Sequence, residues 1–229
     1  MTKVKKAIIP AAGIGSRLFP YTKHINKLML PILNKPIIQY LVDELVDSGI
    51  EEIIITGRYL KAIKEYFRAT PQLLEITRKL GQRGSLSKLK TAKRKCKITF
   101  VKQNKPTGWM FEVYNARKFL KDNFIVVFSD LLYHSRTPAA KQAINVFNKK
   151  ETNIHASGRF VFTPNLIKIL SKINFKAGED LKTVNKVLKI LRNRDELTDV
   201  EIKGTCFNVG SVSEYYNTFT LLGKKELKK

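Results

Sequence analysis

Apolar positions near the N-terminus fall into two short continuous runs separated by one longer periodic segment. Residues 6–10 and 52–56 are short and mainly apolar, as is typical of strands that are buried on both faces of a sheet. Between them, residues 37–49 carry apolar side chains at intervals of three and four, which predicts a helix that ends near Gly49. This order of strand, helix and strand favours a parallel sheet with crossover helices.

The same alternation of strand and helix signals continues along the rest of the chain. Further strands are predicted at residues 97–102, 124–128, 159–162 and 205–209. Further helices are predicted at residues 59–67, 109–120, 138–147, 165–173 and 179–192. The polar stretch 71–95 is predicted to be an insertion that is helical in part. With no repeat and no linker, residues 1–229 are predicted to form one α/β domain with a Rossmann-like, open, mostly parallel mixed sheet and helices on both faces.

Composition limits the class of protein and its compartment. Hydrophobic residues make up 43% of 229 positions, which is enough for the core of one substantial domain. The apolar runs are too short to cross a bilayer, and the basic N-terminus lacks the apolar region of a secretion signal. Cys96 and Cys206 are isolated, so neither a disulfide framework nor a zinc site is expected. We therefore expect a cytoplasmic protein without a membrane partner.

The chain is strongly basic, with 43 lysine and arginine residues against 19 acidic ones and a formal net charge of +24. Such a balance attracts polyanions, including nucleic acid and nucleotide phosphates. The basic residues are dense only at 88–97, where no aromatic side chain is interleaved for base stacking. A solvated basic surface is the favoured interpretation, and nucleic-acid binding is the second.

A loop of small residues follows the first predicted strand. It contains Ala11, Ala12, Gly13 and Gly15. Glycine lets the backbone approach an anion closely and direct its N–H groups toward it, so this loop is a candidate phosphate site. It is not a P-loop, because no Gly-Lys-Ser/Thr follows, and it is a poor dinucleotide fingerprint.

Two cations follow the glycine loop at a spacing of ten residues. Arg17 can hold the β- and γ-phosphates of a nucleotide and stabilise the charge that develops as pyrophosphate leaves. Lys27 can neutralise an attacking phosphate as it approaches. The alternative, a surface turn with two solvated cations, explains the pattern less well than a nucleoside triphosphate site does.

These motifs together resemble a known family. PAAGIGSR at 10–17, KLMLPI at 27–32 and KPIIQY at 35–40 closely resemble the bacterial-type UTP–glucose-1-phosphate uridylyltransferases (UDP-glucose pyrophosphorylases), a family of sugar nucleotidyltransferases. The similarity continues at 48–58, 101–108, 130 and 158–164, so it covers most of a chain that is shorter than the family. The resemblance implies attack of glucose 1-phosphate on the α-phosphorus of UTP, with Mg²⁺, to give UDP-glucose and pyrophosphate. Homodimers or tetramers are also implied.

The resemblance implies roles for residues beyond the loop and its two catalytic cations. Gln103 would read the uracil edge, because a side-chain amide offers a donor beside an acceptor, and it would read thymine equally well. Gly108 would let the backbone lie against the base, and Pro106 belongs to the same nucleotide-binding motif. Without the family, a solvated residue at a strand end is the favoured interpretation of Gln103.

Four further positions would hold the metal and the sugar. Asp130, at the end of a predicted strand, would bind Mg²⁺, and Gly158 and Glu179 would contact the sugar. Asn208 stands where the family has its second metal-binding aspartate, so one negative charge is lost, and we expect Asn208→Asp to raise activity. From spacing alone, Asp130 is equally a cap or turn residue, and Glu179 an acid favoured by a helix dipole.

The departures from the family lie mainly in the sugar-binding half. The stretch between Asp130 and Gly158 is much shorter than in the family, which leaves a nucleotide half at about 1–135 and a reduced sugar half at about 136–229. Bulky residues at 109–111 replace small ones and are expected to crowd the nucleotide. Three alternatives therefore stay open: another sugar 1-phosphate, a thymidine nucleotide, or a weakly active relative that binds nucleotide or RNA.

Overall fold

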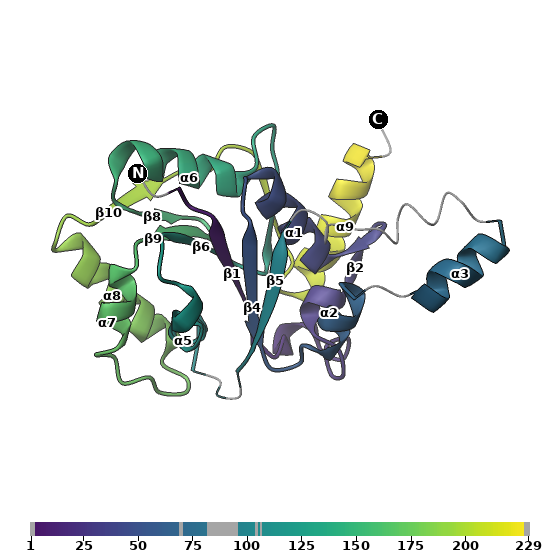
Figure 1. The fold of residues 1–229 in the computed structure, drawn as a ribbon, viewed down its shortest axis with the longest axis horizontal. Coiled ribbons are helices and arrows are strands. Elements are labelled where there is room, and N and C mark those ends of the chain that lie inside the picture. Colours follow the sequence, from purple (N-terminus) through teal and green to yellow (C-terminus); the bar gives the residue numbers. More distant parts are fainter. Residues whose placement is uncertain (1–2, 69–70, 82–95, 104, 106, 227–229) are drawn as a thin grey trace.

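The computed structural model describes residues 3–68, 71–81, 96–103, 105 and 107–226, which are built around one seven-stranded sheet. The strand order is β10-β8-β9-β6-β1-β4-β5 (Figure 1). In that order the strands are Leu197–Val200, Asn153–Ala156, Arg159–Phe162, Phe124–Val127, Lys6–Ala11, Glu52–Gly57 and Lys97–Lys102. The sheet therefore joins strands from the beginning, middle and end of the chain.

The sheet is mixed, and most of its pairs are parallel. Strand β1 pairs in parallel with both β4 and β6, and β4 pairs in parallel with β5. Only β9 runs against its neighbours, pairing antiparallel with β6 and β8, while β10 is parallel to β8. The predicted fold class is confirmed.

Helices cover both faces of the sheet because alternate residues of each central strand point to opposite sides. Ala7 and Ile9 belong to one hydrophobic cluster and Ile8 to the other. The first cluster is covered by α1 (Ile37–Asp47) and α6 (Ala139–Lys150), and the second by α5 (Trp109–Asn115), α7 (Asn165–Leu170) and α8 (Asp180–Arg192) (Figure 1).

Several elements differ from the sequence-based expectation. The predicted helix 109–120 ends at Asn115 and is followed by a 3₁₀ turn, Arg117–Phe119. Strands β8 and β10 were not predicted, and neither were β7 (Leu131–His134) and helix α9 (Val212–Glu226). Strand β7 pairs antiparallel with β11 (Thr205–Asn208), the predicted closing segment. The short elements β2 (Pro31–Ile32), β3 (Lys35–Pro36) and α2 (Lys61–Tyr66) complete the described fold.

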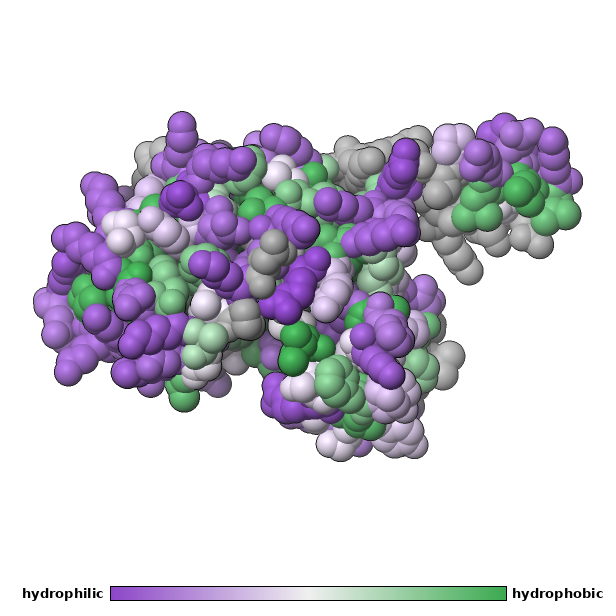
Figure 2. All heavy atoms as spheres, turned by 90° about the horizontal axis from the view of Figure 1, so that it is seen from below, coloured by the Kyte–Doolittle hydropathy of each residue, from purple (hydrophilic) through white to green (hydrophobic). Residues whose placement is uncertain are grey.

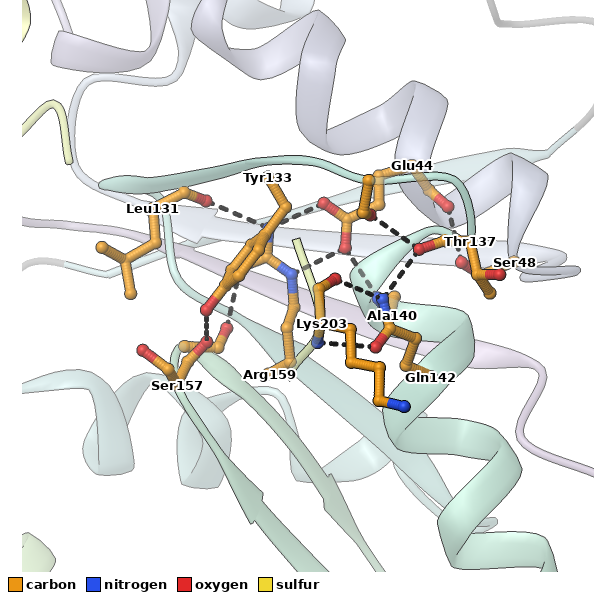
Figure 3. A network of polar contacts seen from close by, with 12 residues as sticks. Glu44, Ser48, Leu131, Tyr133, Thr137, Ala140, Gln142, Ser157, Arg159 and Lys203 are labelled. Atoms are coloured by element: carbon orange, nitrogen blue, oxygen red, sulfur yellow. Dashed lines mark hydrogen bonds and ion pairs between the residues drawn. The ribbon is translucent and has the colours of Figure 1, made fainter. Parts of the chain in front are cut away.

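A buried ion pair links helix α1 to strand β9 (Figure 3). The side chain of Arg159 is fully buried, and its Nε and Nη2 each donate to a carboxylate oxygen of Glu44 at 2.7 Å. The same guanidinium donates to the carbonyls of Leu131 and Gly158, both at 3.0 Å. This network fixes the start of β7 and the turn before β9, which are the segments next to the site described below.

The predicted insertion is helical over α3 (Pro71–Lys79), which projects from the body of the molecule (Figure 1). Its apolar residues Leu73, Ile76 and Leu80 are exposed, while hydrophilic residues cover most of the face seen in Figure 2. Most of the basic run at 88–97 lies outside the described residues. Within the described part of the chain, no helix is both long and apolar enough to cross a bilayer.

Candidate active site

A cavity of about 500 Å³ opens at the carboxyl ends of strands β1 and β6. Ligands of open α/β sheets usually bind at this edge. Six of the predicted residues line the cavity together: Ala12, Gly13, Lys27, Gln103, Gly108 and Asp130. Because these residues come from four separate segments of the chain, the fold brings the predicted nucleotide positions into one space.

The loop after β1 is held at both of its ends. Gly15 has φ +66°, a left-handed conformation that glycine adopts without strain, and its carbonyl accepts a 2.7 Å hydrogen bond from Thr22 Oγ1. Ala11 ends β1 and is buried. Between them, a Cβ added to Gly13 would have no heavy atom within 4 Å, so the loop presents open backbone to the cavity.

A buried carboxylate that the sequence analysis did not single out anchors this loop. Glu112 Oε2 accepts hydrogen bonds from the amides of Ala11 at 3.0 Å and Ala12 at 3.2 Å, and from Thr56 Oγ1 at 2.6 Å. Burial raises the pKa of Glu112 to about 7; the three hydrogen bonds oppose the rise, and the charge of Asp180 adds to it. Because two loop amides already bind Glu112, the loop offers a ligand the backbone from Gly13 onward.

Asn26 joins the loop to the predicted catalytic lysine. Its Nδ2 donates to the carbonyl of Ala11 at 3.0 Å, and its Oδ1 accepts from the amide of Leu28 at 3.0 Å, which caps the 3₁₀ turn Lys27–Met29. Lys27 Nζ then lies 3.8 Å from Asp130 Oδ2. Burial lowers the pKa of Lys27, nearby Arg17 lowers it further, and Asp130 opposes the shift.

Arg17 lies on the exposed side of the loop that follows β1. It lies in the 3₁₀ turn Ser16–Leu18, and a Cβ added to Gly210 would be 3.1 Å from its Nη2. Its effect on the pKa of Lys27 shows that the two cations are within electrostatic range. Lys27 and Asp130 thus pair at the cavity wall, whereas Arg17 does not line the cavity.

The predicted base-binding residues Gln103 and Gly108 both line the cavity. Gln103 is 2% exposed, so the alternative of a solvated strand-end residue is wrong. Its Oε1 accepts the amide N–H of Lys105 at 2.8 Å, and its buried Nε2 has no partner within the protein. Gly108 has φ +88°, and a Cβ there would lie 1.9 Å from Asp180 Oδ1. The Asp180 carboxylate therefore leaves no room for a side chain at position 108. Pro106 lies outside the described residues.

Of the three bulky residues at 109–111, Trp109 is the one that lines the cavity. It packs edge-on against Phe128, with ring centroids 5.1 Å apart. Met110 is fully buried in the core, and Phe111 packs against Phe175 at 5.2 Å. One bulky side chain of the three therefore borders the ligand space.

A nucleotidyl transferase family model matches residues 6–157, more than half of the chain. The chain belongs to the nucleotidyl transferase family. The UTP–glucose-1-phosphate uridylyltransferase of Bacillus subtilis (strain 168) is 30% identical over 265 aligned positions, which cover 95% of this chain and 90% of the relative. That alignment is longer than this 229-residue chain, so the relative carries segments that the chain lacks. A Staphylococcus haemolyticus enzyme of the same name is 40% identical over 151 residues, 65% of this chain and 52% of its own length.

Solved structures confirm the fold of this nucleotidyl transferase. An apo UDP-glucose pyrophosphorylase superposes with a TM-score of 0.89 at 23% identity, covering 97% of this chain and 99% of the other. A UTP-bound UGPase from Acinetobacter baumannii gives 0.88 at 20% identity, covering 97% and 94%. Nearly the whole of this chain therefore has the fold of these solved structures.

The two predicted metal positions of this nucleotidyl transferase are neighbours, although they differ in what they offer. Asn208 lies opposite Leu131 in the β11–β7 pair, and the amide of Val209 donates to the carbonyl of Asp130 at 2.8 Å. Asn208 Oδ1 is a neutral oxygen that also accepts the amide N–H of Gly210 at 2.8 Å, so it is a weaker ligand for a cation than the carboxylate of Asp130.

The donor set fits a cation that is bound mainly by substrate. No group of three or more His, Cys, Asp or Glu residues that could hold a metal occurs among the described residues. Asp130 offers one carboxylate at the cavity wall, and Mg²⁺ is commonly bound by one or two carboxylates together with substrate phosphates. The single carboxylate of Asp130 therefore fits a divalent ion whose other ligands are substrate phosphates.

The predicted sugar residues lie beside the nucleotide cavity. Gly158 borders a second cavity of about 620 Å³, and Phe128 lines both cavities. A Cβ at Gly158 would lie 2.7 Å from Leu131 Cδ1, and its φ of +65° also favours glycine. Glu179 immediately precedes α8, and its carboxylate accepts from Lys182 at 3.4 Å, while the next residue, Asp180, lines the first cavity.

Proposed function

We propose that this chain is a uridylyltransferase that makes UDP-glucose and pyrophosphate from UTP and glucose 1-phosphate. The observation that carries the proposal is the placement of Lys27 beside Asp130 in the cavity that follows the glycine loop, with the buried amide of Gln103 lining the same space. The curated relatives with this activity support the choice of substrates.

Charge neutralisation and positioning account for the reaction. Glucose 1-phosphate attacks the α-phosphorus of UTP in line with the leaving pyrophosphate, so two anions must approach each other. Lys27, at the cavity wall, lowers the repulsion against the incoming phosphate. Arg17, on the exposed side of the loop, stabilises the charge that develops on the pyrophosphate. No covalent intermediate is required.

Mg²⁺ is the proposed cofactor, held by Asp130 together with the phosphates of UTP. Bound there, the ion would neutralise phosphate charge and orient the triphosphate. Asn208 is not proposed to bind the ion, because its neutral oxygen, which also accepts from Gly210, is a weaker ligand than a carboxylate. Its amide nitrogen donates to Glu214 Oε1 at 2.8 Å, so a carboxylate nevertheless lies within one hydrogen bond of this position.

The sugar 1-phosphate is proposed to bind in the second cavity, with Gly158 at its wall, and Glu179, next to the cavity-lining Asp180, is proposed to contact the sugar. A thymidine nucleotide and other sugar 1-phosphates remain the alternatives of the same class. We also propose that the enzyme acts in the cytoplasm, and assembly into dimers or tetramers remains a prediction.

A second candidate function, binding of a polyanion such as RNA, is favoured by one observation. A third cavity, of about 400 Å³, is lined by Arg58, Lys61, Lys64, Arg68 and Lys102 with a single acid, Glu65. Retention of RNA by the protein at physiological ionic strength, lost as salt is raised, would support this function.

A coupled pyrophosphate-release assay with UTP, glucose 1-phosphate and Mg²⁺ tests the enzyme proposal. We expect turnover by the wild type and a large loss in Arg17→Ala and Asp130→Ala. Lys168→Ala, which removes an exposed cation on α7, is the matched control and should leave turnover unchanged. Absence of pyrophosphate release with every sugar phosphate tried would refute the proposal.

A further inference from the structure

Two buried polar atoms without a partner line the nucleotide cavity. They are Nε2 of Gln103 and Oδ1 of Asp180. Buried polar groups are nearly always hydrogen-bonded, because an unpaired one costs about 1–3 kcal/mol. A donor and an acceptor left unpaired in one cavity indicate a ligand that presents an acceptor and a donor to them.

The atom of Gln103 that is left without a partner is a donor. Its Oε1 accepts the amide N–H of Lys105 at 2.8 Å, which orients the side-chain amide. Its Nε2 is buried and has no partner within the protein. A base that presents a carbonyl oxygen would satisfy this nitrogen.

Asp180 supplies the unpaired acceptor. It is the first residue of α8 and lines the nucleotide cavity. Its carboxylate lies directly against Gly108, where any side chain would overlap it at 1.9 Å. Its Oδ1 is buried without a partner and is left for a ligand.

The second carboxylate of the cavity is less suited to this role. Glu112 Oε2 already accepts three hydrogen bonds, two of them from the loop that follows β1. Glu112 therefore shapes the cavity through the loop, whereas Asp180 keeps a buried acceptor without a partner.

We propose that Asp180 determines base specificity: its Oδ1 accepts the imide N3–H of uracil while Gln103 Nε2 donates to the adjacent carbonyl oxygen. This inference rests on the proposed function, because it takes a uridine nucleotide as the ligand. A base without an N–H beside its carbonyl would leave Oδ1 buried and unpaired, which a polar site rejects strongly.

A nucleotide analogue tests the contact without any change to the protein. N3-methyl-UTP keeps both carbonyl groups of UTP and carries a methyl group in place of the imide hydrogen. Calorimetry on the wild type should show that the analogue binds at least about tenfold more weakly than UTP, the usual effect of losing one buried hydrogen bond. Equal affinities for the two nucleotides would overturn the proposal.

The variant Asp180→Asn tests the residue itself. The substitution replaces one of the two acceptor oxygens of the carboxylate by an NH₂ donor, which would oppose the N3–H of uracil if it faces the base. UTP affinity should fall at least about tenfold, while CTP, whose N3 is an acceptor, should lose less or gain. Asp195→Asn, an exposed site beyond the end of α8, should change neither affinity.

The outcomes separate this inference from the proposed function. If the wild type binds UTP and makes UDP-glucose but Asp180→Asn binds UTP as well as the wild type does, Asp180 does not read the base. If the wild type binds CTP better than UTP, Gln103 and Asp180 recognise the exocyclic amine of cytosine and the assignment to uracil is wrong. If the wild type binds no pyrimidine nucleotide at all, the inference and the proposed function both fail.

Discussion

Asn208 Nδ2 donates a hydrogen bond to Glu214 Oε1 across 2.8 Å. From the sequence, Asn208 is a lost metal ligand, and an aspartate there was expected to restore the missing charge. The structure places a second carboxylate at hydrogen-bonding distance, so this substitution has a cost that the sequence did not reveal. Two carboxylates this close cannot both ionise freely.

We therefore expect Asn208→Asp to lower the free energy of unfolding at pH 7 by about 1–3 kcal/mol in the absence of Mg²⁺. Denaturant titration measures the change. The double variant Asn208→Asp/Glu214→Gln, which restores a donor–acceptor pair, should recover most of the loss and bind Mg²⁺ more tightly than the wild type. A single variant as stable as the wild type at pH 7 would contradict this explanation.

Glu112 should make the stability of the protein depend on pH. Its folded pKa of about 7 lies above the ordinary value of 4.5, so the folded state binds the proton more tightly than the unfolded state. The resulting stability is fully present below pH 4.5 and is lost as the pH rises to about 7, a total of about 3 kcal/mol. Glu112→Gln keeps an oxygen acceptor for the loop amides without the charge.

Urea titrations at pH 5 and pH 8 check the Glu112 prediction. The wild type should lose about 2.5 kcal/mol more than Glu112→Gln between the two pH values, because a small part of the effect is already lost at pH 5. Glu151→Gln, which changes an exposed glutamate, should retain the pH dependence of the wild type. Parallel pH profiles for the wild type and Glu112→Gln would refute the role of burial at this site.

The buried pair between Glu44 and Arg159 should contribute strongly to stability when only one partner is removed. Arg159→Met leaves an uncompensated buried carboxylate and should cost about 3–5 kcal/mol in the free energy of unfolding. Lys79→Met, which breaks the exposed pair with Glu75, should cost less than about 1 kcal/mol. A double-mutant cycle with Glu44→Met measures the coupling, which should exceed about 1 kcal/mol.

Asn26 should act on catalysis through Lys27. Asn26→Ala removes the hydrogen bond to the Ala11 carbonyl and the cap of the turn that carries Lys27, while it leaves every charge in place. We expect kcat to fall on the order of tenfold or more, with a smaller change in KM for UTP. The conservative variant Asn26→Asp keeps the cap and should recover part of kcat. An unchanged kcat in Asn26→Ala would show that Lys27 needs no such positioning.

The parts of the fold that could be predicted are those with a strong local pattern. Strand β1 is nearly continuous in apolar residues and helix α1 has one clear apolar face, so both were predicted within two residues of their ends. Strands β8 and β10 are four residues long and mix polar with apolar side chains, so nothing local separates them from loops. Helix α9 is rich in Tyr, Thr and Phe, which have weak helix propensity, and its formation depends on tertiary packing.

Some residues of the candidate site could likewise be predicted from the sequence, and others could not. Gly13, Lys27 and Asp130 could be predicted because each follows from a motif or from its place at the end of a strand. Glu112 could not, because the loop amide of Ala11 that it binds lies 101 positions away in the sequence. For Asp180, the informative contacts are with Gly108 and Trp109, which only the folded chain brings near.

Formation of UDP-glucose by Lys27→Met is the most direct test of the central claim that this cavity transfers a uridylyl group. With UTP, glucose 1-phosphate and Mg²⁺, the wild type should form UDP-glucose and pyrophosphate in equal amounts. Lys27→Met should lose on the order of a hundredfold in kcat, and Lys168→Met should match the wild type. UDP-glucose formation by Lys27→Met at the wild-type rate would contradict the account.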